Sequence, residues 1–279
     1  MYKGFSSGLL GFGGRTLRED APLASKYHYE GIAVDIAGES KNDPGEVRDL
    51  LEKNRLKPAC FGLPLDFRTS REAFEEGMKK LPGYCEFARG IGNNRCNTYI
   101  LPASDTLDYK ANYELHKTRL GAAAKILEEY GILFGLEFVG PPSFRRNKKY
   151  EFIHNLDALL ELLNDIGTSN MGILLDAFHW DLAGQTYGDF KKIPDRRWVT
   201  VVHINDGIAG VPAEEQQDQV RELPGATGFI RIADFFKGLQ DLDYDGPVLV
   251  EPFYQPFKTM ALEDAVKMAK EAMDKVWPR

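Results

Sequence analysis

The stretch "GILLDAFHW", residues 172–180, brings an apolar run directly up to Asp176, and His179 follows three residues later. An apolar run without polar alternation is typical of a strand that is buried on both faces. A carboxylate at the end of such a strand needs an explanation, because burying a charge without a partner is costly. The fold predicted from the rest of the chain supplies one.

Seven further runs have the character of strands: "KGFSS" (3–7), "GIAVDI" (31–36), "KPACFGL" (57–63), "CNTYIL" (96–101), "ILFGLE" (132–137), "WVTVVH" (198–203) and "PVLVE" (247–251). Between them lie stretches with helical spacing of apolar residues, such as 71–88, 109–130, 151–166 and 262–276. About eight β-α units without a Pro/Gly/Ser-rich linker predict one domain over residues 1–279, a (β/α)8 TIM barrel. An open, doubly wound parallel sheet is the alternative, and it fits eight units less well.

Composition excludes several classes of function. A formal net charge of −7 and a pI near 5.4 argue against a nucleic-acid partner, and the densest basic cluster, "FRRNKKYEF" (144–152), is interpreted as a solvated loop. No apolar run approaches the roughly 20 residues that span a bilayer, so no membrane association is expected. Cys60, Cys85 and Cys96 form no C-x-x-C pair, which fits reduced thiols and predicts a cytoplasmic location. The glycine-rich "GLLGFGG" (8–14) lacks the G-x-G-x-x-G order of dinucleotide-binding loops.

Four successive strands of the predicted barrel end in residues that can bind a metal ion. Glu137 ends the fifth strand, Asp176 the sixth, His203 the seventh and Glu251 the eighth. One polar residue at a strand end commonly marks only the point where the strand reaches solvent. Four in succession are harder to explain in that way, because the carboxyl ends of barrel strands surround one central site. The pattern therefore predicts a metal centre.

Three carboxylates and one imidazole offer hard oxygen donors, a single nitrogen and no thiolate. Such a set favours Mn²⁺, with Mg²⁺ or Co²⁺ as alternatives, in near-octahedral geometry with positions left for water or substrate. Together with a dication, three carboxylates leave a charge of about −1, which suits a neutral polyhydroxylated ligand better than a strongly anionic one.

The motifs "GLEFVG", "LLDAFHW", "VVHINDG", "RELPGATG" and "VEPF" resemble those of the xylose isomerase-like TIM-barrel superfamily of sugar isomerases and epimerases. The resemblance covers essentially the whole chain. It implies that Glu137, Asp176, His203 and Glu251 bind the metal and that Glu137 and Glu251 also act as the acid/base pair. It also implies substrate contacts by His179 and Arg221, and a homo-dimer or homo-tetramer, because related barrels commonly form both.

Two other residues keep more than one interpretation on sequence alone. Asp206 in "HINDG" could bind substrate, orient His203, or make the turn that the Asn-Asp-Gly composition favours. His179 could donate a hydrogen bond to substrate, bind the metal, or simply serve as a loop or capping residue. The other histidines, His28, His116 and His154, are expected in helices as surface or packing residues.

The expected reaction is isomerisation or epimerisation of a small polyhydroxy carbonyl compound. A metal bound to carbonyl and hydroxyl oxygens would stabilise the enediolate, while one glutamate removes a proton and the other returns one from the opposite face. If the enolate instead expels a β-hydroxyl group, the same site is a dehydratase of a cyclic keto-polyol. A non-catalytic sugar-binding barrel would not need both glutamates. A trinuclear-zinc nuclease would need more histidines than the chain's five.

Overall fold

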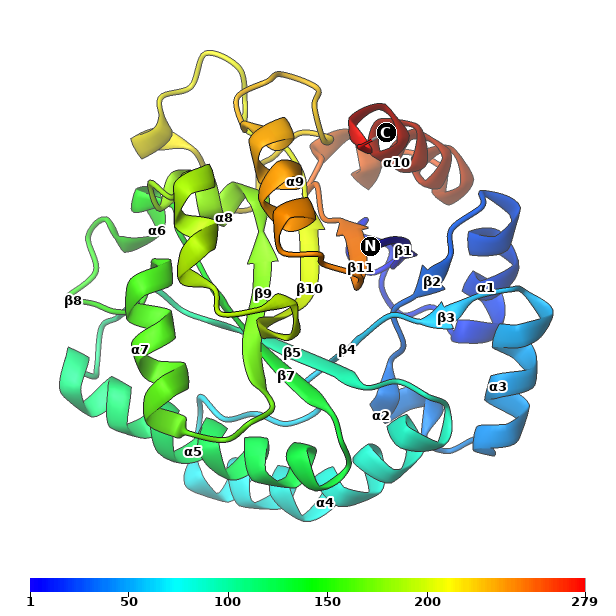
Figure 1. Cartoon of the computed structure of the whole chain (residues 1–279), viewed down its shortest axis with the longest axis horizontal. Helices are drawn as coiled ribbons and strands as arrows, with labels where there is room; N and C mark the ends of the chain where they lie inside the picture. The colour runs from blue at the N-terminus through cyan, green and yellow to red at the C-terminus, as the bar shows by residue number, and fades with distance from the viewer. Residues whose placement is uncertain (279) are drawn as a thin grey trace.

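The computed structural model describes residues 1–278, and its parallel strands form the wall of a barrel surrounded by helices (Figure 1). The strands of this wall are β1 (Tyr2–Phe5), β2 (Gly31–Ile32), β3 (Lys57–Pro58), β4 (Phe61–Gly62), β5 (Arg95–Ile100), β7 (Leu133–Phe138), β9 (Met171–Asp176), β10 (Val199–Ile204) and β11 (Pro247–Val250). The predicted (β/α)8 barrel is confirmed, and each of the eight predicted runs overlaps a strand. β6 (Ala103–Ser104) and β8 (Tyr150–Glu151) form a separate antiparallel pair.

The third predicted run closes the ring. This run contains two short strands with different neighbours: β3 pairs with β2, and β4 pairs with β5. The strand order β3-β2-β1-β11-β10-β9-β7-β5-β4 therefore begins and ends on the same stretch of chain. A closed ring of parallel strands leaves no free edge and directs every second side chain toward the barrel axis.

The helices lie outside the ring in Figure 1. They are α1 (Leu17–Lys26), α2 (Ile36–Glu39), α3 (Pro44–Lys53), α4 (Arg71–Gly90), α5 (Tyr109–Glu129), α6 (Pro142–Arg145), α7 (Leu156–Ile166), α8 (Ala177–Leu182), α9 (Ile232–Asp241) and α10 (Leu262–Val276). Short 3-10 turns are η1 (Tyr187–Lys192), η2 (Arg196–Trp198), η3 (Ala213–Glu215) and η4 (Gln255–Lys258). The helices predicted over 71–88, 109–130 and 262–276 are confirmed to within two residues at each end.

The helix predicted over 151–166 begins later, at Leu156. Residues 150 and 151 form β8 instead, and Asn155 caps the helix by accepting a hydrogen bond from the Ala158 N–H at 3.0 Å. His154 therefore lies before the helix, and His28 lies in a turn with a φ of 57°. Apolar spacing did not distinguish the helix from the chain entering it, whereas an asparagine cap marks the start locally.

The alternation of the strands explains why Asp176 ends a buried run. Leu174, Val201 and Leu249 form a small cluster inside the ring, while their strand neighbours pack outward against the helices. Asp176, His203 and Glu251 each lie two residues further on and therefore continue the inward face. The apolar interior thus ends in a layer of polar side chains at the carboxyl ends of the strands.

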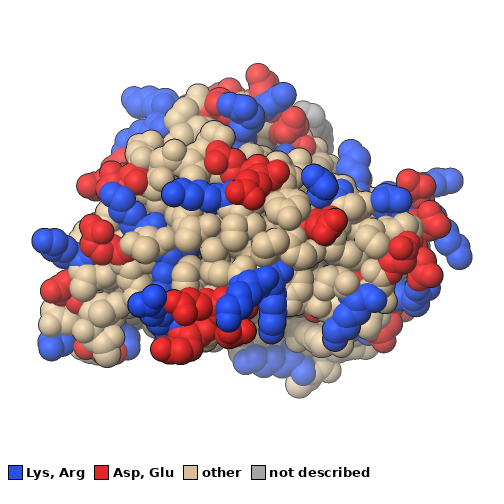
Figure 2. Space-filling model, turned by 90° about the horizontal axis from the view of Figure 1, so that it is seen from below, with Lys and Arg blue, Asp and Glu red and all other residues tan. Residues whose placement is uncertain are grey.

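Charged side chains of both signs lie on the surface of the protein (Figure 2). On the face shown in Figure 2, Lys and Arg side chains are interleaved with Asp and Glu, without a continuous basic patch. Within residues 1–278, no helix is both long enough and apolar enough to cross a membrane.

Burial of His116 predicts an acid-sensitive fold. The ring is 5% exposed on α5, packs against Phe67 and Phe152, and has its pKa lowered to about 4, chiefly by burial. Because the unfolded histidine binds a proton near pH 6.5, its contribution to stability is present above that pH and is lost as the pH falls toward 4. Between pH 7 and 4.5 this linkage removes about 2 kcal/mol from the free energy of unfolding.

We therefore expect the free energy of unfolding of His116→Leu to fall by about 2 kcal/mol less than that of the wild type between pH 7 and 4.5. Urea unfolding in EDTA measures both. His28→Asn is the matched control, because His28 is exposed and asparagine tolerates its positive φ. Identical pH dependence in the wild type and His116→Leu would contradict the prediction.

Candidate metal centre

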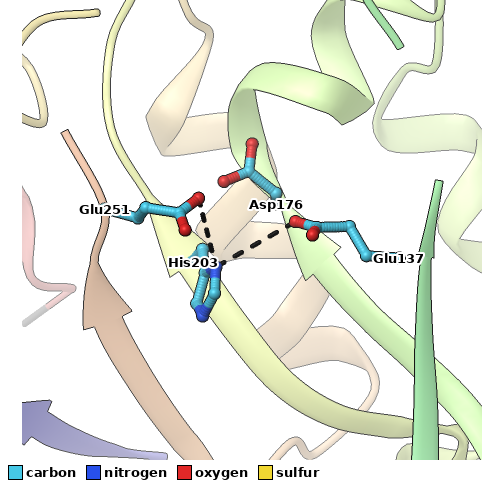
Figure 3. Close-up of side chains that lie close together, drawn as sticks. All are labelled: Glu137, Asp176, His203 and Glu251. Atoms are coloured by element: carbon cyan, nitrogen blue, oxygen red, sulfur yellow. Dashed lines mark ion pairs between the residues drawn. The ribbon is translucent and has the colours of Figure 1, made fainter. Parts of the chain in front are cut away.

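The structure brings the four predicted metal ligands together at the mouth of the barrel. Each of Glu137, Asp176, His203 and Glu251 offers one ligand atom, and these atoms all lie within 4.8 Å of one another. Figure 3 shows the four side chains pointing toward a common centre from four different strand ends. His203 Nδ1 lies 3.4 Å from Glu251 Oε2 and 4.0 Å from Glu137 Oε1. Four donors this close can surround a single ion.

Strand order determines which side each ligand comes from. β10 pairs with both β9 and β11, so that His203 lies beside Asp176 and Leu249 in the sheet. β7 and β11 are the outer two of these four strands. Glu137 and Glu251 therefore approach the centre from opposite sides, with Asp176 and His203 between them (Figure 3).

Unpaired buried atoms and excess charge show that a dication fits this donor set. Glu137 Oε1 and His203 Nδ1 are buried and have no hydrogen-bond partner within residues 1–278. Buried polar atoms are rarely left unpaired unless an ion or water completes them. Arg221 pairs with the carboxylates of Asp176, Asp218 and Glu251, while Glu137, whose ligand atom lies near those of Asp176 and Glu251, has no ion pair with it. A divalent ion would supply both the missing partners and the missing positive charge.

The two buried carboxyl groups have pKa values displaced in opposite directions. Burial raises the pKa of Glu137 well above its usual range, and the negative charges of Glu251 and Asp176 add to the effect. Burial also opposes ionisation of Asp176, but Arg221 and the two nearby histidines outweigh it and lower its pKa. Without a cation, Glu137 therefore holds its proton to higher pH than Asp176 does.

Arg221 lies within this centre although it comes from the long connection after β10. Its side chain is 1% exposed, and its guanidinium packs between Phe178 and Phe253, 4.6 and 4.9 Å from their ring centres. Nη1 donates to Asp176 Oδ2 at 3.0 Å and to Glu251 Oε2 at 3.3 Å. The structure therefore places Arg221 against the predicted metal ligands, where it holds two of their carboxylates.

His179 lies beside Arg221 on the first turn of α8. Its ring is buried and its pKa is lowered, mainly because burial disfavours the charged form of the imidazole. Nε2 can then accept a hydrogen bond from Arg221 Nη2 at 3.2 Å, and it lies 3.9 Å from Glu137 Oε1. Asp176 caps the same turn by accepting from the His179 backbone N–H at 2.9 Å. The Asp-x-x-His spacing thus has a local cause in helix capping.

Two residues of this centre were not singled out by the sequence analysis. Asn205 donates through Nδ2 to Asp176 Oδ2 at 2.7 Å and to the Glu251 carbonyl at 3.2 Å. Asp218 accepts from Arg221 Nη2 at 2.8 Å and lies 3.5 Å from His179 Nε2. Asn205 could have been suspected, because it comes two residues after His203 and so continues the inward face. Asp218 carries no such signal, since it lies in a loop.

The side chain of Asp206 hydrogen-bonds to the backbone of the loop that follows it. It is fully buried, and its two carboxylate oxygens accept hydrogen bonds from four backbone N–H groups, those of Gly207, Thr227, Gly228 and Ile230, at 2.8 to 2.9 Å. These bonds tie the two ends of the 207–230 segment together. They favour the turn-forming interpretation of Asp206 over substrate binding, and its neighbour Asn205 contacts two of the predicted metal ligands.

Curated relatives of this chain include an isomerase and an epimerase. The chain is 24% identical over 227 residues to an inosose isomerase of Halalkalibacterium halodurans, covering 81% of this chain and 77% of the relative. It is 25% identical over 161 residues to a D-psicose 3-epimerase of Enterocloster bolteae, covering 54% of this chain and 46% of the relative.

Solved structures and a family model agree on the fold. A xylose isomerase domain protein from Alicyclobacillus acidocaldarius superposes with a TM-score of 0.87 at 26% identity, covering 99% of this chain and 98% of the other. The IOLI protein, solved with a zinc atom, superposes with a TM-score of 0.81 at 20% identity, over 99% and 98% of the two chains. Residues 22–276 match the family model described as xylose isomerase-like TIM barrel, and the chain therefore belongs to that family.

Proposed function

We propose that this protein is a divalent-metal-dependent isomerase or epimerase of a sugar or a related polyhydroxy carbonyl compound. The observation that carries the proposal is the closeness of four ligand atoms, all within 4.8 Å of one another, at the carboxyl ends of the strands. The names of the curated relatives, inosose isomerase and D-psicose 3-epimerase, support the same reaction class. When bound by these four residues, a divalent ion would supply charge stabilisation for the oxygens of the substrate.

Glu137 and Glu251 are proposed as the acid/base pair. They approach the centre from opposite sides, so a substrate carbon between them has one carboxylate on each face (Figure 3). One carboxylate removes the proton next to the carbonyl, and the other donates a proton to the opposite face, which inverts the configuration. The raised pKa of Glu137 supports it as the group that can hold a proton.

His179 and Arg221 are proposed as substrate contacts. His179, whose pKa is lowered, lies next to Glu137, and Arg221 spans the carboxylates of Asp176 and Glu251. Both are buried at the edge of the centre, where their N–H groups could orient substrate hydroxyl groups. The charge of Arg221 is already paired with carboxylates. The proposed substrate is uncharged, because the carboxylates around the centre would repel a phosphate.

The proposed ion is Mn²⁺, with Mg²⁺ or Co²⁺ as alternatives. Support comes from the donor set, in which oxygen predominates and sulfur is absent. The zinc atom bound by the IOLI protein supports a divalent ion, and elemental analysis of the purified protein would identify it. A cytoplasmic location and a homo-dimer or homo-tetramer belong to the same proposal, and the three buried free cysteines support the former.

Solvent deuterium exchange tests this function directly. The metal-loaded protein is incubated in D₂O with a panel of ketoses, inososes and 3-keto-glycosides, and we expect deuterium at the carbon next to the carbonyl of at least one of them. An epimer adds no chromophore, whereas a dehydration product is a conjugated enone that absorbs in the near ultraviolet. Absorbance that grows with turnover would replace the proposal by a dehydratase, and a lack of exchange in every compound would indicate a binding protein.

A further inference from the structure

A large cavity extends from the metal centre toward the first half of the barrel. Its volume is about 880 Å³, and His203 belongs to its lining. From there the lining runs past the ends of β1, β2 and β4 to Val47 and Leu50 on α3, a helix of the outer layer. Ligand pockets span roughly 300 to 1,000 Å³, and those near the upper limit enclose molecules much larger than one sugar ring.

Small inward-facing residues create this space. Ala33 and Cys60 belong to the cluster inside the ring, and Gly62 lies two residues beyond Cys60 on the same face. A Cβ atom at Gly62 would meet nothing within 4 Å. The corresponding ends of β9, β10 and β11 carry the metal ligands, so the barrel mouth is filled on one side and hollow on the other. The hollow is thus a feature of the strands themselves, not of a loose loop.

The wall of the cavity carries a fixed polar group. Asp20 of α1 is 7% exposed; its Oδ2 accepts a hydrogen bond from Ser7 Oγ, and its Oδ1 accepts one from Arg15 Nε at 2.5 Å. Arg15 is thereby held at Nε, while neither of its Nη atoms has a hydrogen-bond partner within residues 1–278. Its side chain is 28% exposed and lines the cavity. A guanidinium oriented in this way presents two parallel donors to a ligand.

The charges of the lining indicate what kind of ligand fits. Two arginines, Arg15 and Arg18, are outnumbered by four carboxylates, Asp20, Asp35, Glu39 and Glu46. A phosphate or another strongly anionic group would be repelled by this excess of negative charge. A neutral group with several hydroxyls can accept hydrogen bonds from the free Nη donors and donate to the surrounding carboxylates.

We propose that this cavity binds a second sugar-sized polyhydroxylated group, and that Arg15, oriented by Asp20, recognises its hydroxyls. The substrate class is then a keto sugar that carries a second ring through a glycosidic bond, with the keto ring at the metal centre. This inference rests on the proposed function, because it places the reacting ring next to His203. Arg15 is a specificity residue, and Asp20 and Ser7 are positioning residues.

Calorimetric binding to the metal-loaded protein tests the proposal, with D-fructose as the one-ring probe. The two-ring probes are lactulose, leucrose and isomaltulose, in which D-fructose carries a hexose on O4, O5 or O6. We expect at least one of them to bind at least about tenfold tighter than D-fructose, the gain expected from hydrogen bonds to a charged group. Arg15→Ala should abolish this gain and leave the D-fructose affinity within about twofold.

Two further variants keep the test decisive. Arg18→Ala is the matched control, because Arg18 lines the same cavity but is exposed and its side chain makes no hydrogen bond within residues 1–278. It should change neither affinity. Arg15→Lys keeps a positive charge beside Asp20, and hence the fold, but removes the paired donors, so it should also lose most of the gain. Melting temperatures report whether each variant is folded.

The proposal is overturned if none of the three two-ring ketoses binds more tightly than D-fructose, or if Arg15→Ala weakens both classes equally. Failure of the proposed function has a different signature. Tighter binding of a two-ring ketose, without deuterium exchange in these probes or in any compound of the panel of ketoses, inososes and 3-keto-glycosides, would leave the second subsite standing and reject the isomerase. Deuterium exchange into D-fructose, with no two-ring ketose bound more tightly than D-fructose, would support the isomerase and reject the second subsite.

Discussion

His203→Ala should yield a folded protein that has lost its divalent ion, and treatment of the wild type with EDTA should abolish turnover. The imidazole is the only nitrogen donor among the four proposed ligands, and removing it leaves three carboxylates to bind the ion. Residues that only support a ligand typically contribute 10- to 100-fold to metal affinity, so loss of a ligand itself should cost more than about 100-fold.

A graded series makes this expectation specific. Asn205 donates to Asp176 Oδ2 and to the Glu251 carbonyl without belonging to the four ligands. Asn205→Ala should therefore weaken metal binding by roughly 10- to 100-fold, between the wild type and His203→Ala. His28→Asn, which removes a histidine outside the centre, should bind metal like the wild type.

Elemental analysis after equilibrium dialysis measures the affinities, and thermal melting provides an independent measurement. An ion that binds only the folded state adds about 2.7 kcal/mol to stability when its concentration is 100 times the dissociation constant. The wild type should show this gain and His203→Ala should not. Equal metal content in these two proteins would reject the metal centre.

The sequence was sufficient to predict the barrel and to predict that the four candidate ligands meet at its mouth, because both depend on local patterns. Eight apolar runs separated by helical spacing identify the fold, and the period of two along a strand determines which residue faces the axis. Asp176 follows Leu174 on the inward face, and Glu251 follows Leu249 in the same way. Parallel pairing then brings the strand ends together without further information.

Contacts between distant loops could not be predicted in this way. Arg221 reaches Asp176 across 45 residues, and its burial between Phe178 and Phe253 depends on how the connection after β10 folds back. Arg15 contacts Asp20 only five residues away, but its orientation also depends on Ser7, which donates to Asp20 from 13 residues away. Asp206 shows the opposite difficulty, because the sequence allowed three roles and only the tertiary structure reveals its four backbone partners.

Glu137→Gln and Glu251→Gln should each lower kcat by at least about 100-fold, because general acid/base catalysis contributes a factor of this size or more. Glutamine keeps an oxygen donor, so each variant should retain part of its metal, whereas it cannot accept the proton from carbon. Asp218→Asn is the matched control. It removes a carboxylate that contacts Arg221 and His179 but that is not proposed to transfer a proton to or from the substrate. It should affect kcat less than either glutamine variant.

The two glutamine variants should also differ from each other in deuterium exchange. Glu137 and Glu251 stand on opposite sides of the centre, so each serves one of the two epimers as the base. Glu137→Gln should exchange deuterium into only one epimer, and Glu251→Gln only into the other, since the remaining carboxylate can still remove and return a proton on its own face. NMR of each purified epimer in D₂O with the metal-loaded variant measures this. A single-base isomerase or a dehydratase would not give mirrored exchange, so its absence with intact wild-type turnover would leave both residues as metal ligands and reject two-base epimerisation.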